Sequence, residues 1–95
     1  MRSMTPDRIR RRLIVRGQVQ GVFFRDSTRR RAESHGVAGW AANRGDGAVE
    51  IVLEGPPDAV EAVAGFARRG PSRARVESVE EAEEEPEGLS GFAAW

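Results

Sequence analysis

Residues 17–25 read GQVQGVFFR, and they carry the chain from an apolar strand into the start of a helix. Gly17 and Gly21 allow tight bends, so that successive backbone N–H groups converge on one point. The helix that follows adds unpaired N–H groups and the positive end of its dipole. Arg25 adds a planar guanidinium that can hold two oxygens of a phosphate at once. This segment is therefore predicted to bind an anion with the shape of phosphate.

The composition limits the class of protein. The chain has 95 residues, enough for a single domain (1–95) with one modest core, and we expect residues 1–9 to be a frayed tail. Its 15 arginines balance 15 acidic residues and no lysine is present, so the chain lacks the strong positive field of a nucleic-acid binder. The absence of cysteine excludes disulfides, thiol nucleophiles and thiolate metal sites.

The same composition suggests a location. No apolar stretch approaches the length that spans a membrane. Residues 1–7 also lack the apolar core of a signal peptide, so a cytoplasmic protein is the default expectation.

Apolar periodicity predicts the secondary structure. Val49, Ile51 and Leu53 alternate as in a strand with one buried face. Val60, Val63, Ala64 and Ala67 form the stripe of a helix that faces a core and ends near Arg69. The complete prediction has strands at 10–16, 37–43, 48–54 and 74–82, a helix at 23–34, a second helix that follows the break at 55–58 and ends at Arg69, and a short terminal strand around Phe92 and Trp95. Six glutamates between Glu80 and Glu87 are interpreted as a solvated, mobile loop.

This order of elements is typical of a ferredoxin-like βαββαβ sandwich in the α+β class. We expect an antiparallel sheet with two helices on one face and a short extra C-terminal strand. Right-handed crossovers place the first and third strands at the centre and the first loop beside the second strand. That arrangement predicts that Asn43, at the end of the second strand, lies near the anion-binding loop.

Two sequence motifs, one after the other along the chain, resemble the motifs of a known family. GQVQGVFFR resembles the acylphosphatase pattern G-x-V-Q-G-V-x-F-R. GWAANRGDGAVE, at residues 39–50, resembles the second acylphosphatase pattern, in which a glycine–aromatic pair precedes an asparagine and a glycine turn into a strand. The similarity extends over most of Leu13 to Val79, so the chain resembles a small single-domain acylphosphatase.

The resemblance implies an enzyme that hydrolyses the mixed anhydride of acyl phosphates to a carboxylate and inorganic phosphate, with no metal, cofactor or covalent intermediate. It implies that Arg25 binds the phosphate and that Asn43 positions the attacking water. The loop that would hold the phosphoryl oxygens through backbone N–H groups comprises Gln20, Gly21, Val22, Phe23 and Phe24, with Gly17 and Gly21 setting its geometry. The leaving carboxylate needs no general acid, because its conjugate acid has a pKa of about 4.

Other polar residues receive less specific interpretations. His35 follows the first helix and is interpreted as a cap or surface residue. Trp40 is predicted to pack in the core. The run of Arg8, Arg10, Arg11 and Arg12 is the best hint of an acidic partner, but exposed arginines at a frayed tail and strand start are the better explanation. Arg44 and Ala41 depart from the family pattern beside Asn43, and the small alanines at 93 and 94 predict a weak last strand.

Two alternatives come from other functional classes. A non-catalytic phosphate-binding or regulatory module of the same fold would use the same Arg25, so only an assay separates it from an enzyme. An RNA-binding sandwich is disfavoured because the first and third strands lack stacking aromatic residues. We therefore expect small acyl phosphates and inorganic phosphate as ligands, no nucleic-acid or membrane partner, and a monomer.

Overall fold

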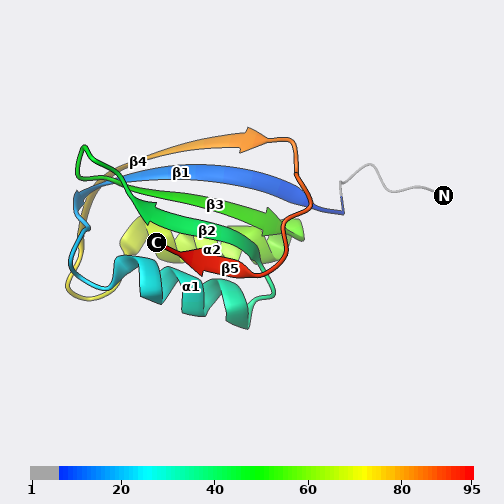
Figure 1. Cartoon of the computed structure of the whole chain (residues 1–95), viewed down its shortest axis with the longest axis horizontal. Helices are drawn as coiled ribbons and strands as arrows, with labels where there is room; N and C mark the ends of the chain where they lie inside the picture. Colours follow the sequence, from blue (N-terminus) through cyan, green and yellow to red (C-terminus); the bar gives the residue numbers. More distant parts are fainter. Residues whose placement is uncertain (1–6) are drawn as a thin grey trace.

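Two helices pack against one face of a five-stranded sheet (Figure 1). The structure is a computed structural model and describes residues 7–95. The elements are β1 (Ile9–Gln18), α1 (Phe24–Ser34), β2 (Ala38–Asn43), β3 (Val49–Gly55), α2 (Pro57–Arg69), β4 (Arg75–Glu84) and β5 (Phe92–Ala94). Their order confirms the predicted ferredoxin-like α+β fold. The predicted frayed tail falls mainly on residues 1–6, which lie outside the described residues, and Ile9 already pairs with Gly55.

The strand order is β4-β1-β3-β2-β5, so β1 and β3 occupy the centre as predicted. The pairs β1–β3, β1–β4 and β2–β3 are antiparallel, whereas β5 pairs parallel with β2. The prediction of an antiparallel sheet is therefore wrong at this edge. After β4 the chain reverses direction and crosses to the opposite edge of the sheet. There β5 runs in the same direction as its neighbour β2, so the two strands are parallel (Figure 1).

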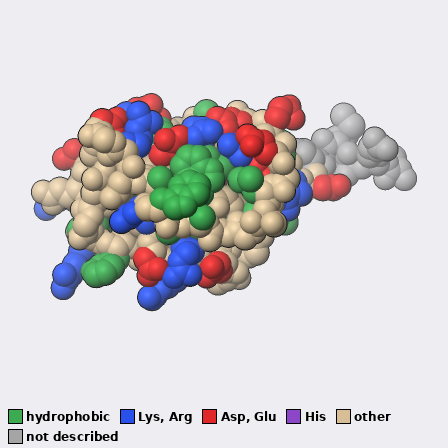
Figure 2. Space-filling view, viewed as in Figure 1, with side chains coloured by type: hydrophobic (Ala, Val, Ile, Leu, Met, Phe, Trp, Pro, Cys, Tyr) green, Lys and Arg blue, Asp and Glu red, His purple; other side chains and the backbone are tan. Residues whose placement is uncertain are grey.

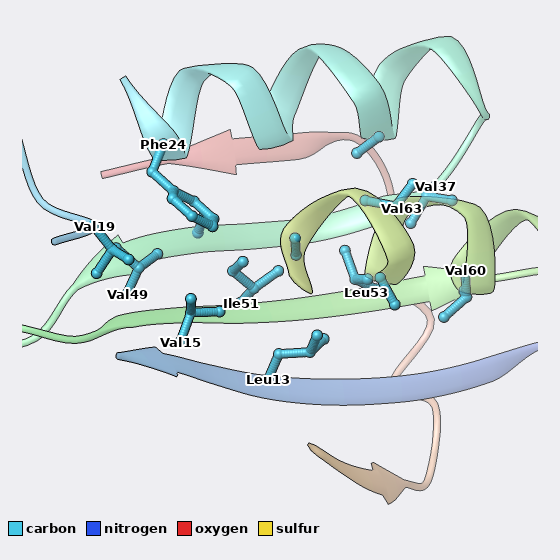
Figure 3. Close-up of a cluster of buried hydrophobic side chains, with 14 of the residues drawn as sticks. Leu13, Val15, Val19, Phe24, Val37, Val49, Ile51, Leu53, Val60 and Val63 are labelled. Carbon is cyan, nitrogen blue, oxygen red and sulfur yellow. The ribbon is translucent and has the colours of Figure 1, made fainter. Parts of the chain in front are cut away.

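The core lies between the sheet and the helices (Figure 3). The alternating residues of β3 and the stripe of α2 are buried, as their spacing predicts. In α1, Thr28 is fully buried, and its hydroxyl donates a hydrogen bond to the Phe24 carbonyl at 2.8 Å, so this polar group is satisfied. Neither helix of the described residues is long and apolar enough to cross a membrane.

The glutamate-rich segment is the main departure from the predicted elements. β4 continues to Glu84, so the interpretation of residues 80–87 as a mobile loop is wrong for most of its length. In the β1–β4 register Arg10 lies opposite Glu84 and Arg11 opposite Glu83. Arg10 Nε donates to Glu84 Oε1 at 2.8 Å, and Arg11 Nη2 donates to Glu83 Oε1 at 3.3 Å. Cross-strand charge pairing thus favours a strand that glutamate alone disfavours.

The face of the sheet without helices carries alternating charges. Arg12 on β1 contacts Glu84 on β4 at 2.7 Å and also pairs with Glu50 on β3. Figure 2 shows basic and acidic side chains interspersed over this part of the molecule. Arginines of the run near the start of the chain therefore form ion pairs with glutamates of the same molecule, and these pairs account for the run without an acidic partner.

Trp40 also lies on this face, so its predicted place in the core is wrong. Its neighbour Ala41 pairs with Ile51, a core residue, and alternation along a strand turns Trp40 to the opposite side. The ring of Trp40 is half-buried and lies 5.5 Å from the ring of Trp95, between centroids. The Arg12 guanidinium lies 5.7 Å from the same ring.

Glu54 is a buried carboxylate that connects three parts of the fold. It is fully buried and accepts hydrogen bonds from Arg10 Nη1 at 2.7 Å and from the backbone N–H groups of Glu87, Gly88 and Leu89 at 2.9, 3.1 and 3.0 Å. Burial alone would raise the pKa of Glu54, but these donors outweigh it and lower the pKa to about 2. This carboxylate therefore anchors the segment that leads from β4 to β5.

Replacing Glu54 with glutamine should lower the free energy of unfolding by about 2–4 kcal/mol at pH 7, because Arg10 Nη1 and the backbone N–H groups of residues 87–89 lose their charged acceptor. Glu85→Gln makes the same charge change at an exposed position and should stay within about 0.5 kcal/mol of the wild type. Urea unfolding followed by circular dichroism measures both. Equal losses in the two variants would contradict the role assigned to Glu54.

The same carboxylate should make stability depend on pH. The pKa of Glu54 is lower in the folded state than its ordinary value of 4.5, so its contribution is complete above that value and is lost as the pH falls toward 2. The stability difference between wild type and Glu54→Gln should therefore be smaller at pH 3 than at pH 7. A difference that is constant over this range would show that the charge of Glu54 is not the source of the stabilisation.

Candidate active site

The loop between β1 and α1 depends on two glycines for different reasons. Gly17 has a φ of 131°, and a Cβ there would lie only 2.1 Å from the Arg75 carbonyl oxygen, so a side chain is excluded. Gly21 has a φ of 76° but open space around it, so its requirement is conformational. On either side of Gly21, Val19 and Phe24 are each 1% exposed and attach the loop to the core. The loop is therefore held at both ends and open in the middle.

Phe23 has an unusual backbone conformation. Its φ of 62° and ψ of 24° lie in the left-handed region, and it is the one non-glycine residue among 7–95 with a positive φ. A bulky residue in this region costs on the order of 1 kcal/mol. Phe23 stands at the N-cap of α1, where no side chain accepts a hydrogen bond from the first turn. The N–H groups at this helix start therefore remain available to an anion.

A cavity of about 440 Å³ opens beside this helix start. Arg25, in the first turn of α1, lines it, and its Nη1 donates to the backbone oxygen of Trp95. This contact holds the guanidinium beside the cavity. The lining consists of Val19, Gly21, Phe23, Phe24, Arg25, Asp26, Arg29 and Ala94. The structure therefore brings Arg25 and much of the predicted phosphate-binding loop together around one space.

Asp26 places a negative charge in the same lining. A hydrogen bond from Arg29 at 2.6 Å lowers the pKa of Asp26 below its ordinary value. Partial burial acts in the opposite direction, and the charge of Arg30 lowers the pKa further. The carboxylate is therefore ionised near neutral pH, but two arginines balance it. The charges around the cavity, with Arg25 included, favour an anionic ligand.

Gln20 connects this loop to the turn between β2 and β3. Its side-chain Nε2 donates hydrogen bonds to the carbonyl oxygens of Arg44 and Ala48, both at 2.9 Å. The sequence motif predicts a role for the Gln20 backbone in the loop and does not reveal this side-chain contact. The sequence gives one indication of this contact. The Gln20 amide lies in a loop that is mainly apolar and glycine, and its two N–H donors need acceptors.

Asn43 is the last residue of β2 and is exposed. It pairs with Val49, whose side chain is in the core on the helix side of the sheet. Residues paired across antiparallel strands present their side chains on the same face, so Asn43 also faces the helix side. The end of β2 and the start of α1 lie at the same end of the molecule (Figure 1).

Contacts on either side of Asn43 link it to the loop and to Arg25. Two residues before it, the Ala41 carbonyl accepts a hydrogen bond at 2.9 Å from the N–H of Trp95, the residue that Arg25 contacts. One residue after it, a carbonyl accepts the hydrogen bond from Gln20. Asn43 does not line the 440 Å³ cavity, so its role there remains a prediction.

Asp46 shapes the turn that follows Asn43. It accepts hydrogen bonds from the Ala48 N–H at 3.2 Å, from Arg16 at 3.1 Å and from Arg44 at 3.3 Å. The Ala48 N–H makes the largest contribution to lowering the pKa of Asp46, followed by Arg16. Arg44, which departs from the family pattern, therefore directs its charge to this turn and does not line the cavity.

His35 is far from this group of residues. It is the C-cap of α1 and is exposed, in agreement with the cap or surface role expected from the sequence. The cavity lies at the other end of the same 11-residue helix, which is roughly 16 Å long at the normal rise per residue. The helix thus separates this imidazole from Arg25.

Comparisons with known proteins agree with the motifs. A protein-family model described as acylphosphatase matches residues 11–94. An acylphosphatase from Thermococcus kodakarensis is 54% identical over 85 residues, which cover 90% of this chain and 93% of the relative. One from Natronomonas pharaonis is 49% identical over 86 residues, covering 90% and 94%. The solved structure of an acylphosphatase from Coxiella burnetii matches with a TM-score of 0.88 and 35% identity, covering 94% of each chain.

The contact between Gln20 and the β2–β3 turn predicts a local effect. Gln20→Leu removes both hydrogen bonds, so the turn should open more often and the N–H groups of Arg44 and Gly47 should exchange with solvent roughly 10-fold faster. Hydrogen exchange followed by NMR measures these amides. Gln18→Leu, an exposed glutamine two residues earlier, is the matched control and should leave them unchanged. Equal exchange rates in wild type and Gln20→Leu would rule out this anchoring role.

Proposed function

This chain belongs to the acylphosphatase family, and we propose that it hydrolyses the mixed anhydride bond of carboxyl phosphates to give a carboxylate and inorganic phosphate. Acylphosphatases are hydrolases, so the class of enzyme predicted from the sequence is confirmed. The observation that supports the finer proposal is the position of the Arg25 guanidinium at a cavity bordered by an open loop and a helix start.

Binding of the phosphoryl group follows from these donors. Arg25 contacts two phosphoryl oxygens through its planar fork, as guanidinium groups bind tetrahedral anions. The backbone N–H groups of the loop at residues 20–24 and of the first turn of α1 donate hydrogen bonds to the phosphoryl oxygens that Arg25 does not contact. Because the loop is attached to the core at both ends, these donors are positioned before the substrate arrives.

The chemical step is a direct displacement. The oxygen of a water molecule held by the Asn43 amide attacks phosphorus, and the bond from phosphorus to the acyl oxygen breaks. The carboxylate leaves with the electron pair of that bond, and no acid is needed because the pKa of its conjugate acid is about 4. The proton lost by the water passes to a phosphoryl oxygen of the substrate. The positive charge of Arg25 stabilises the transition state, so the proposed reaction needs no metal ion.

The proposal also covers the oligomeric state and the binding partners of the protein. We propose that the protein acts as a monomer on small-molecule substrates, without a nucleic-acid or membrane partner. The arginines of β1 support the absence of a nucleic-acid partner, because they are paired with glutamates on β3 and β4.

Substitution of the two proposed site residues tests the reaction. Asn43→Ala should lower kcat for benzoyl phosphate by about 100- to 1,000-fold, since a preorganised polar group is lost. Arg25→Ala should lower kcat at least as much and should also weaken inhibition by inorganic phosphate, because it removes the main charge at the cavity. Hydrolysis is measured in the presence of EDTA, with circular dichroism to confirm folding.

The matched control is Arg73→Ala, which removes an exposed arginine that does not line the cavity and should keep activity within about twofold. Activity that depends on an added metal ion would contradict the metal-free mechanism. If the wild type is inactive but still binds inorganic phosphate through Arg25, the chain is a non-catalytic phosphate-binding module and the proposed reaction is wrong.

A further inference from the structure

The cavity beside Arg25 has one polar side and one apolar side. Arg25, Asp26 and Arg29 form the polar side. Among the apolar lining residues, Val19 and Phe24 are each 1% exposed and belong to the core, whereas Phe23 is 72% exposed. Phe23 therefore offers the larger free apolar surface to a ligand. In Figure 2, hydrophobic surface stands beside basic side chains at the end of the molecule where α1 begins.

Exposure of one aromatic ring is common and by itself indicates nothing. Phe23, however, also holds the left-handed backbone conformation that glycine or asparagine adopts more easily. Packing in the core does not explain its ring, because its neighbour Phe24 fills the core beneath the loop. An exposed phenylalanine in a strained position at a cavity is better explained by contact with a ligand.

The charges in the cavity narrow the chemistry of that ligand. Arg29 donates to Asp26 at 2.6 Å and to Glu33 at 3.0 Å, so its charge is already balanced. Under the proposed function, Arg25 is occupied by the phosphoryl group. A second negative charge on the substrate would therefore meet no free cation among the residues that line the cavity.

We propose that Phe23 is a specificity-determining residue that contacts the acyl group of the substrate and favours apolar, above all aromatic, acyl groups. The inference rests on the proposed function, in which the loop backbone around Phe23 and Arg25 fixes the phosphoryl group. The acyl group then extends from a phosphoryl group bound in the cavity that Phe23 and Arg25 both line. The volume of about 440 Å³ is within the range of sites that hold small molecules and leaves room beyond the phosphoryl group.

This contact should act on substrate binding. The acyl group touches the ring in both the ground state and the transition state, so the interaction lowers KM and leaves kcat nearly unaffected. An aromatic pair of this kind changes affinity roughly 3- to 10-fold. An acetyl group is too small to gain most of this effect.

The test compares benzoyl phosphate with acetyl phosphate in wild type, Phe23→Asn and Phe23→Tyr. Asparagine tolerates the left-handed backbone but removes the ring, and tyrosine keeps the ring. The ratio of kcat/KM for benzoyl phosphate to that for acetyl phosphate should fall roughly 3- to 10-fold in Phe23→Asn, mainly through the KM for benzoyl phosphate. Phe23→Tyr should keep the ratio within about twofold.

A disturbance of the loop would change both substrates alike and leave the ratio at its wild-type value, which would overturn this inference. Calorimetry with phenacylphosphonate and acetonylphosphonate, in which a methylene replaces the bridging oxygen, supplies a readout that does not need turnover. The aromatic phosphonate should bind more tightly to wild type, and Phe23→Asn should lose that preference. Absence of turnover with both phosphates would refute the proposed function, whereas equal binding of the two phosphonates would refute only the role of Phe23.

Discussion

Glu54 carries a charge without any exposed surface, and a buried carboxylate is tolerated only when donors surround it. Its donors come from Arg10 in β1 and from the backbone of residues 87–89, which lie far from β3 in the sequence. Once these hydrogen bonds form, the chain after β4 is committed to the far edge of the sheet. There β5 pairs with β2, and Trp95 meets both Ala41 and Arg25. The wall of the candidate site thus depends on a carboxylate in another part of the sheet.

Local features are sufficient to predict much of this fold. The alternation of Val49, Ile51 and Leu53 and the helical spacing of Val60 and Val63 reflect burial, which acts on each element separately. The loop is also predictable, because two glycines close together mark a tight bend, although the clash with Arg75 that excludes a side chain at Gly17 depends on a distant strand. These local features are enough to select the loop and its arginine as the candidate site.

Features that depend on distant partners could not be predicted in this way. The extension of β4 beyond residue 82 is stable because arginines some 70 positions earlier lie opposite Glu83 and Glu84, and no local pattern contains that information. The contact between the Gln20 side chain and two carbonyls likewise exists only once the β2–β3 turn is in place. For Asn43 the sequence predicted a place near the loop. The structure places Asn43 between Ala41, whose carbonyl accepts a hydrogen bond from Trp95, and Arg44, whose carbonyl accepts one from Gln20.

The acidic character of β4 has a further consequence for the protein in concentrated solution. β4 is an edge strand, and its exposed side chains are largely glutamates. If two copies approached each other edge to edge, their rows of carboxylates would meet and repel. The same residues that pair with β1 inside one molecule therefore oppose strand addition between molecules. This protection against aggregation is electrostatic, so it weakens at high ionic strength and in acid, where carboxylates lose their charge.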